Sequence, residues 1–204
     1  VAVFNLAGAM YSGGTLDPLP QAAGERVLLL PLRQLLEWQS AIPSDTDIYI
    51  FENPQVFEAV ISALDSDMLL PTLICTSGWP STAAMKLLDL LVAQSPSNRL
   101  HYSGDFDLKG LQIASYLMTR YPDSCHPWRF DPDTYAVAMQ AGGSMARANE
   151  LNTLNGLPEV FSPLIATMQE KKRWAYQEGI VHLLTEDVRR NAAEKNKATQ
   201  IAKR

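Results

Sequence analysis

Short runs of apolar residues alternate along the chain with longer stretches in which apolar residues recur at helical spacing. Strands are predicted at 27–30, 48–51, 72–75, 100–103 and 126–130. Helices are predicted at 32–38, 53–64, 82–93, 108–121 and 131–140. Strands that alternate with helices of this length predict crossover units and a mainly parallel sheet. Because the strands are continuously apolar, we expect an α/β fold with helices on both faces of that sheet.

The two ends of the chain lack this alternation. Residues 1–25 contain several Gly and Pro residues and are interpreted as a linker or the remnant of a missing N-terminal region. The chain starts at Val1 rather than Met, and we therefore expect it to be part of a longer protein. Residues 26–141 are predicted to form the core domain. Residues 142–204 are predicted to form a loop, a helical extension at 162–188 and a basic tail.

Composition narrows the class of protein. Apolar residues make up 47% and charged residues 19%, which is typical of a folded domain with a sizeable core. The net charge of −5 argues against a protein that coats nucleic acid through bulk positive charge. No apolar run has the length of a membrane span, and no signal peptide is recognisable, so we expect a cytoplasmic protein without a membrane partner. Two cysteines are too few for a disulfide framework.

Positive charge is concentrated at the C-terminal end of the chain. Residues 171–204 hold nine of the 17 Lys and Arg residues but only four of the 22 Asp and Glu residues. A solvated helix face and tail is the first interpretation of this segment, and a contact with nucleic acid or an acidic partner is the second.

Acidic residues follow two of the predicted strands. Glu52 comes directly after the strand at 48–51, and Asp105 and Asp107 follow the strand at 100–103. Ligands bind outside the carboxyl ends of strands in open α/β sheets, and Asp-x-Asp in extended backbone points both side chains to one side. A divalent cation would offset their repulsion, and oxygen ligands favour Mg²⁺ or Mn²⁺. Glu52 would be a further ligand or a general base for the attacking water.

Structural interpretations of the same residues stay open. Asp107 is well placed to cap the helix that starts at 108, Asp105 suits a turn, and Glu52 suits a strand end next to a helix N-terminus. Ser77 and Gly78 form either a plain turn or a backbone nest for a phosphate. No P-loop or dinucleotide fingerprint is present.

Four segments carry a resemblance to a known family. They are Glu-Asn-Pro at 52–54, LICTSGWPS at 73–81, LHYSGDFDLKGLQIA at 100–114 and PWRF at 127–130 followed by Tyr135. Together they resemble a toprim-type domain, and more closely the C-terminal toprim domain of the nuclease subunit of the Wadjet anti-plasmid systems. The resemblance covers roughly residues 15–185.

The resemblance implies a Rossmann-like, toprim-like fold and a set of functional residues. The family signature is one Glu at the first core strand and Asp-x-Asp at a later one, which correspond to Glu52, Asp105 and Asp107 as catalytic residues and metal ligands. Gly78 corresponds to the Gly of the family's Gly-x-Pro-Ser turn. Glu178 corresponds to a late Glu that joins the ligands.

The implied function is that of a metal-dependent DNA endonuclease, with one or two Mg²⁺ or Mn²⁺ ions. Its partners would be double-stranded DNA, an SMC-like motor with accessory subunits of a bacterial plasmid-defence complex, and a second copy of the chain in a homodimer. Ser77, Gly78 and Lys109 are the candidate substrate-binding residues. The chain departs from the family pattern at Leu108, where an aromatic residue is common, and at Lys109, where Pro is frequent.

Two other functions are compatible with the sequence. The first is a non-catalytic toprim module that docks partner subunits and uses its acids only for structure. The second, a primase-like polymerase, would need basic nucleotide-binding residues near the acids, and the sequence has few of them there.

Overall fold

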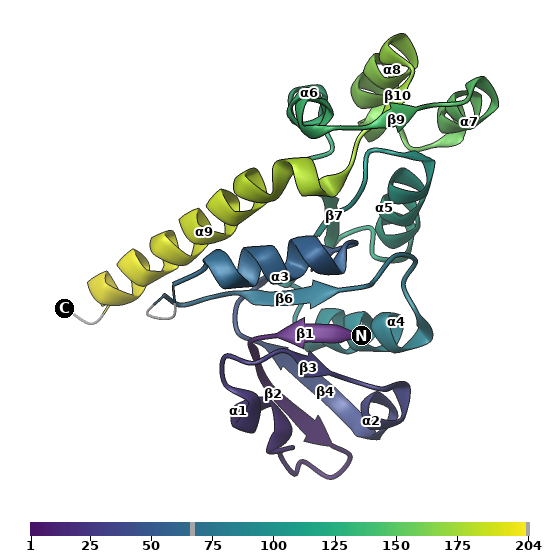
Figure 1. The fold of residues 1–204 in the computed structure, drawn as a ribbon. Coiled ribbons are helices and arrows are strands. Elements are labelled where there is room, and N and C mark those ends of the chain that lie inside the picture. The colour runs from purple at the N-terminus through teal and green to yellow at the C-terminus, as the bar shows by residue number, and fades with distance from the viewer. Residues whose placement is uncertain (66–67, 203–204) are drawn as a thin grey trace.

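A six-stranded sheet forms the centre of the molecule in the computed structural model, which describes residues 1–65 and 68–202 (Figure 1). Across the sheet the strands lie in the order β3 (Leu28–Leu29), β1 (Ala2–Phe4), β6 (Thr72–Cys75), β5 (Asp47–Phe51), β7 (Arg99–Ser103) and β8 (Cys125–Pro127). The pairs β5–β6, β5–β7 and β7–β8 are parallel, and β1 is antiparallel to both of its neighbours. Five strands therefore run one way, which confirms the predicted mainly parallel α/β fold.

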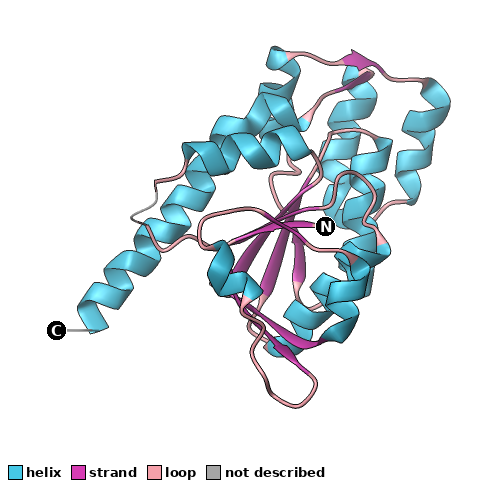
Figure 2. Cartoon of the chain, turned by 60° about the horizontal axis from the view of Figure 1, so that its bottom comes forward, coloured by secondary structure: helices cyan, strands magenta, loops and turns pink. Residues whose placement is uncertain are grey.

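Helices cover both faces of this sheet (Figure 2). The principal ones are α3 (Pro54–Ala63), α4 (Thr82–Gln94), α5 (Leu108–Arg120) and the long α9 (Val181–Ala202). Right-handed crossovers place α3 on one face, where it packs against α9, and α4 and α5 on the other. The connections that leave the neighbouring strands β5 and β7 thus go to opposite faces. Such a switch point opens a crevice at the carboxyl ends of the two strands.

Residues 1–25 are not the linker that their composition predicts. They supply β1 to the main sheet, and β2 (Leu6–Tyr11) pairs with β4 (Trp38–Pro43) in a small sheet accompanied by α1 (Leu19–Ala23) and α2 (Leu32–Glu37). The buried Asp17 carboxylate fixes this segment, because it accepts hydrogen bonds from the Tyr11 hydroxyl at 2.7 Å and from Trp38 Nε1 at 2.8 Å. The pairing partners come from distant parts of the chain, and composition alone gives no sign of them.

The C-terminal third also differs from the prediction. It contains α6 (Pro132–Ala141), β9 (Ser144–Met145), α7 (Ala148–Thr153), α8 (Ser162–Lys171), β10 (Arg173–Trp174) and the 3₁₀ turn η3 (Gln177–Ile180). The single helical stretch predicted at 162–188 is wrong: α8 ends where Lys172 adopts a left-handed φ of 54°. The chain then pairs with β9 through β10 before α9 begins. The predicted division at 141–142 into a core and an extension stays a prediction.

Local signals located the other elements well. Asn53, Ser81, Asp107 and Asp131 each accept a hydrogen bond from the first turn of the helix that they precede, as N-cap residues do. The strand predicted at 126–130 is shorter and starts earlier, at Cys125. In the described part of the chain, no helix combines the length and the hydropathy needed to cross a membrane.

Candidate functional site

Glu52 lies at the switch point of the sheet, directly after β5. Its backbone N–H donates to Ser103 O at 3.1 Å, and its carbonyl accepts from the Gly78 N–H at 3.0 Å. These contacts fix its main chain between the end of β7 and the loop that follows β6. The residue is only 5% exposed.

The Glu52 carboxylate is held by donors on both oxygens. Oε2 accepts from the Tyr102 hydroxyl at 3.3 Å and from the Asp105 N–H at 3.3 Å, while Oε1 lies 3.2 Å from Lys109 Nζ. The chain passes so close here that a Cβ on Gly104 would lie 2.6 Å from Glu52 Oε2. Burial and the neighbouring carboxylate raise the pKa of Tyr102 well above its usual value, so this hydroxyl stays a donor.

Asp105 carries the clearest electrostatic signature of the site. Its Oδ1 accepts from the Gln177 N–H at 2.8 Å. The pKa of Asp105 is raised to about 6, mainly by burial and in addition by the negative charges of Glu52, Asp107 and Glu178, while the hydrogen bond from Gln177 lowers it. Four carboxylates from three segments of the chain therefore interact electrostatically in this crevice.

Asp107 has a structural role that the sequence analysis left open. Its Oδ1 accepts from the Gly110 N–H at 2.7 Å, which caps the N-terminus of α5. The negative charge of Asp107 also contributes to the raised pKa of Asp105. The cap and a role in ligand binding are compatible, because a carboxylate has a second oxygen.

The turn η3 brings a third segment into the site. Glu178 Oε1 accepts from Asn53 Nδ2 at 2.7 Å, and Gln177 Oε1 accepts from the Asn53 N–H at 3.1 Å. Gln177 is fully buried, and its Nε2 has no hydrogen-bond partner among the described residues. A buried donor without a partner is costly and is found mainly where a site needs it.

The candidate substrate-binding residues line the other side of Glu52. Ser77 and Gly78 both have left-handed φ angles, of 56° and 86°. The Gly78 N–H is taken by the Glu52 carbonyl, so the Ser77 hydroxyl and Lys109 are the groups on this side that can meet a phosphate. Lys109 Nζ lies 2.9 Å from the position of a Cβ on Gly78, so the end of the lysine side chain would have to shift if this residue carried a side chain.

The candidate ligands are carboxylate oxygens, which suit a hard divalent cation, although their side chains do not converge on one point. All the candidate ligands are carboxylates, and the repulsion expressed in the raised pKa of Asp105 is what a bound cation would relieve. Across the described residues, however, no group of three or more His, Cys, Asp and Glu side chains is arranged so that it could hold a metal ion. Lys109 supplies the positive charge next to Glu52, and Asp107 is turned toward its helix cap.

Comparison with known proteins gives a family but no activity. The family model described as "Protein of unknown function C-terminus (DUF2399)" matches residues 28–188, which is most of the chain. The chain belongs to this family. The region matched by DUF2399 contains all four carboxylates of the site and ends within α9. No curated protein matches the chain.

Two residues of the site were missed at the sequence level. The sequence analysis gives Asn53 only as the first residue of the helix predicted at 53–64, yet it binds both residues that η3 contributes. Gln177 carries no local signal at all, because its partners lie more than 70 residues away. The other candidate residues, including Glu178, lie around the carboxyl ends of β5 and β7.

Proposed function

We propose that this DUF2399 domain is a metal-dependent nuclease that hydrolyses phosphodiester bonds of DNA. The observation that supports this most is the position of Asp105. It lies half-buried at the switch point beside Glu52, with a pKa raised to about 6 by desolvation and by three further carboxylates. Concentrated, partly buried negative charge of this kind is expected at sites that bind Mg²⁺ or Mn²⁺.

The residues take distinct roles under this proposal. Glu52, Asp105 and Asp107 would hold the metal, with Glu178 as a further ligand, and a bound metal would supply charge stabilisation and activate the water that attacks the phosphate. Glu52 accepts the proton of that water, since its carboxylate is oriented by Tyr102 and by the Asp105 N–H. Lys109 turns from Glu52 toward the phosphate and stabilises the charge that develops there. Ser77 binds a non-bridging oxygen.

Surface charge next to the site supports DNA as the substrate. We call β9, β10 and their flanking residues Arg147 and Lys172 the basic ribbon; its exposed cations are Arg147, Lys172 and Arg173. None of the three forms an ion pair within the described residues, whose salt bridges involve other cations. The ribbon continues into Ala175, which pairs with Phe106 between the two aspartates. It is therefore well placed to bind the DNA backbone beside the carboxylates.

The resemblance to the Wadjet nuclease subunit extends the proposal to a biological setting. In that setting the domain would cut double-stranded DNA in a plasmid-defence complex, as a homodimer together with an SMC-like motor and accessory subunits. Those partners would supply most of the affinity for DNA, since the chain itself is acidic.

Cleavage of supercoiled plasmid in the presence of Mn²⁺ tests the proposal. We expect nicking by the wild-type chain and a loss of at least about 100-fold in Asp105→Ala and Glu52→Ala, because each removes a ligand for the metal. Asp123→Ala is the matched control. It removes one exposed carboxylate in the turn before β8, at the amino ends of the parallel strands and away from the site, and should leave nicking unchanged. Full activity of Asp105→Ala would contradict the mechanism.

One observation favours a second function, a docking module without catalysis. Glu52 already has three donors, including an ammonium group, and Asp107 already caps a helix, so both acids are stabilised by the protein alone. A metal that binds only the folded state raises its melting temperature. A docking module should therefore show no shift with Mg²⁺ or Mn²⁺, whereas the nuclease should show one that Asp105→Ala abolishes.

A further inference from the structure

Two aromatic rings lie together on the surface of the molecule. Trp79 is 50% exposed and Tyr116 is 39% exposed, and their ring centroids are 5.6 Å apart with 38° between the planes. The other three tryptophans of the chain are at most 8% exposed. Single exposed hydrophobic residues are common on proteins, but a paired, solvent-facing Trp and Tyr points to a ligand.

The pair borders the carboxylate site on the side of Lys109. Trp79 follows Gly78 in the loop between β6 and α4, and Lys109 Nζ reaches that glycine while contacting Glu52. Tyr116 lies seven residues after Lys109 on α5, which is two helical turns along the same face. The two rings therefore continue the surface that leads out of the crevice.

The surroundings of the pair are polar rather than apolar. Most residues that flank the two rings along the loop and along the exposed face of α5 are polar, namely Ser77, Ser81, Gln112, Ser115, Thr119 and Arg120, beside the apolar Pro80 and Met118. The other exposed large hydrophobic residues lie in other parts of the chain, among them Leu16, Leu36, Met145 and Val160. The core of a protein–protein interface needs a wider apolar area than two rings provide.

We propose that Trp79 and Tyr116 form a stacking platform for an unpaired nucleobase of DNA. This inference rests on the proposed nuclease function and narrows its substrate. Aromatic side chains bind single-stranded nucleic acid by stacking on base faces, whereas duplex DNA covers those faces with neighbouring bases. A base held on the platform would carry its phosphate toward Lys109 and the carboxylates. The substrate class is therefore DNA with a single-stranded, frayed or extruded nucleotide at the point of cleavage.

Tryptophan fluorescence tests the platform directly, because Trp79 is the tryptophan that solvent and ligands reach most readily. We titrate the wild-type chain with a short poly-dT oligonucleotide in EDTA, so that no cleavage occurs. Saturable quenching is expected. Fluorescence anisotropy of a labelled oligonucleotide should show binding weakened about tenfold or more in Trp79→Ala, since stacking contributes about that much per base. Trp79→Phe should restore most of the affinity.

Controls separate stacking from other effects. Leu36→Ala removes another exposed apolar side chain, 64% exposed and on α2, and should leave binding unchanged. A blunt hairpin duplex should bind more weakly than poly-dT and should be insensitive to Trp79→Ala.

Two results would overturn the inference: a flat titration, as expected if the platform docks a protein instead, or equal binding of poly-dT by Trp79→Ala and wild type. Plasmid nicking that depends on Asp105 would survive either result, so failure of the platform is distinguishable from failure of the nuclease. Quenching without any nicking would identify a binding module for single strands.

Discussion

At the scale of single residues, Asp105 best illustrates how the fold sets chemistry. Its carboxylate is half-buried beside Glu52, and one backbone hydrogen bond from Gln177 does not offset the desolvation and the surrounding negative charge. The protonated form is favoured up to about pH 6. Without a bound cation, ionised Asp105 is therefore a source of instability at neutral pH.

The variant Asp105→Asn tests this property in metal-free buffer. The pKa of Asp105 is near 3.8 in the unfolded chain and about 6 in the folded one, so the folded state binds more protons between these values. The free energy of unfolding of the wild type should fall as the pH rises from about 4 to about 6. The free energy of unfolding of Asp105→Asn should not show this decrease. Above that pH range it should exceed the wild-type value by about 1–3 kcal/mol. Urea denaturation at several pH values, with EDTA present, measures it, and equal stability near pH 8 would refute the shift.

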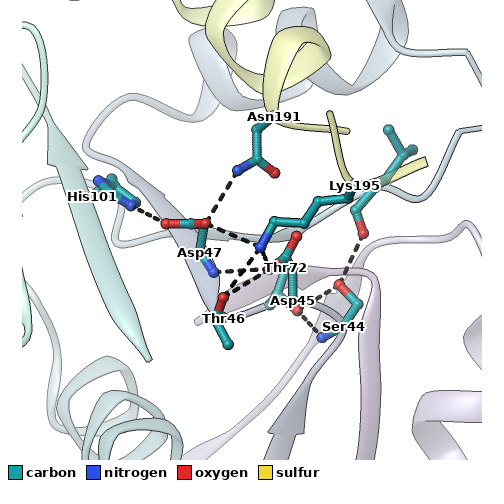
Figure 3. A network of polar contacts seen from close by, with 9 residues as sticks. Ser44, Asp45, Thr46, Asp47, Thr72, His101, Asn191 and Lys195 are labelled. Atoms are coloured by element: carbon teal, nitrogen blue, oxygen red, sulfur yellow. Dashed lines mark hydrogen bonds and ion pairs between the residues drawn. The ribbon is translucent and has the colours of Figure 1, made fainter. Parts of the chain in front are cut away.

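At the scale of elements, α9 determines where η3 and its two site residues lie. Near its start, Asp187 accepts from Trp128 Nε1 at 2.8 Å and from two nitrogens of Arg129. One turn later Asn191 donates to Asp47, and two turns later Lys195 donates to Asp45, both at the start of β5 (Figure 3). Since η3 leads directly into α9, these contacts also position Gln177 and Glu178.

The second of these attachments is centred on Asp47. Its Oδ1 lies 2.7 Å from His101 Nε2, and its Oδ2 accepts from Asn191 Nδ2 at 3.2 Å and lies 3.6 Å from Lys195 Nζ (Figure 3). The hydrogen bond with His101 lowers the pKa of Asp47 to about 2, assisted by Asn191 and Lys195 and opposed by burial. The ionised carboxylate thus stabilises the attachment of α9.

Acid titration of Asp47→Asn tests this attachment. The stabilisation by Asp47 is present above its unfolded pKa of about 3.8 and is lost as the pH falls toward about 2. Asp47→Asn should lower the free energy of unfolding at neutral pH by about 1–2 kcal/mol and flatten its dependence on pH in that acid range. Chemical denaturation from about pH 2 to 7 measures both, with Asp123→Asn as the exposed control. Identical acid dependence of variant and wild type would show that the network does not attach α9.

At the scale of the whole molecule, the distribution of charge matters more than the net charge of −5. The acids of the crevice have the basic ribbon on one side and Lys109 with the aromatic platform on the other. DNA that spans the crevice would meet positive groups before and after the carboxylates. Such an arrangement lets an acidic protein bind a polyanion locally.

The salt dependence of DNA binding tests the basic ribbon. Each phosphate contact with a single strand contributes about 0.7 to the slope of log affinity against log salt concentration. The triple variant Arg147→Ala, Lys172→Ala, Arg173→Ala should lower that slope by about 2 for poly-dT, as measured by anisotropy. The charge-matched control is Arg26→Ala, Lys86→Ala, Arg99→Ala, which changes cations outside the ribbon. An equal loss of slope in both triples would mean that only the total charge matters.

Local sequence signals were enough to locate the strand–helix–strand units of the parallel sheet and to place Glu52 and Asp105 at the ends of its strands. Continuous apolar runs located the strands, and side chains such as Asn53 and Asp107 located the helix starts, because both signals act over a few residues. Glu52 and Asp105 follow strands that pair in parallel, so their meeting at one edge followed from the fold class.

The remaining features of the fold and of the site depend on tertiary packing. Residues 2–4 form β1 because they pair with both β3 and β6. The helix predicted at 162–188 is interrupted because β10 pairs with β9. Three contacts join residues that are far apart in the sequence. They are the ion pair of Lys109 with Glu52, the hydrogen bond of Gln177 to Asp105 and the aromatic pair of Trp79 and Tyr116. Such contacts depend on how whole elements pack, and no local pattern of residues records them.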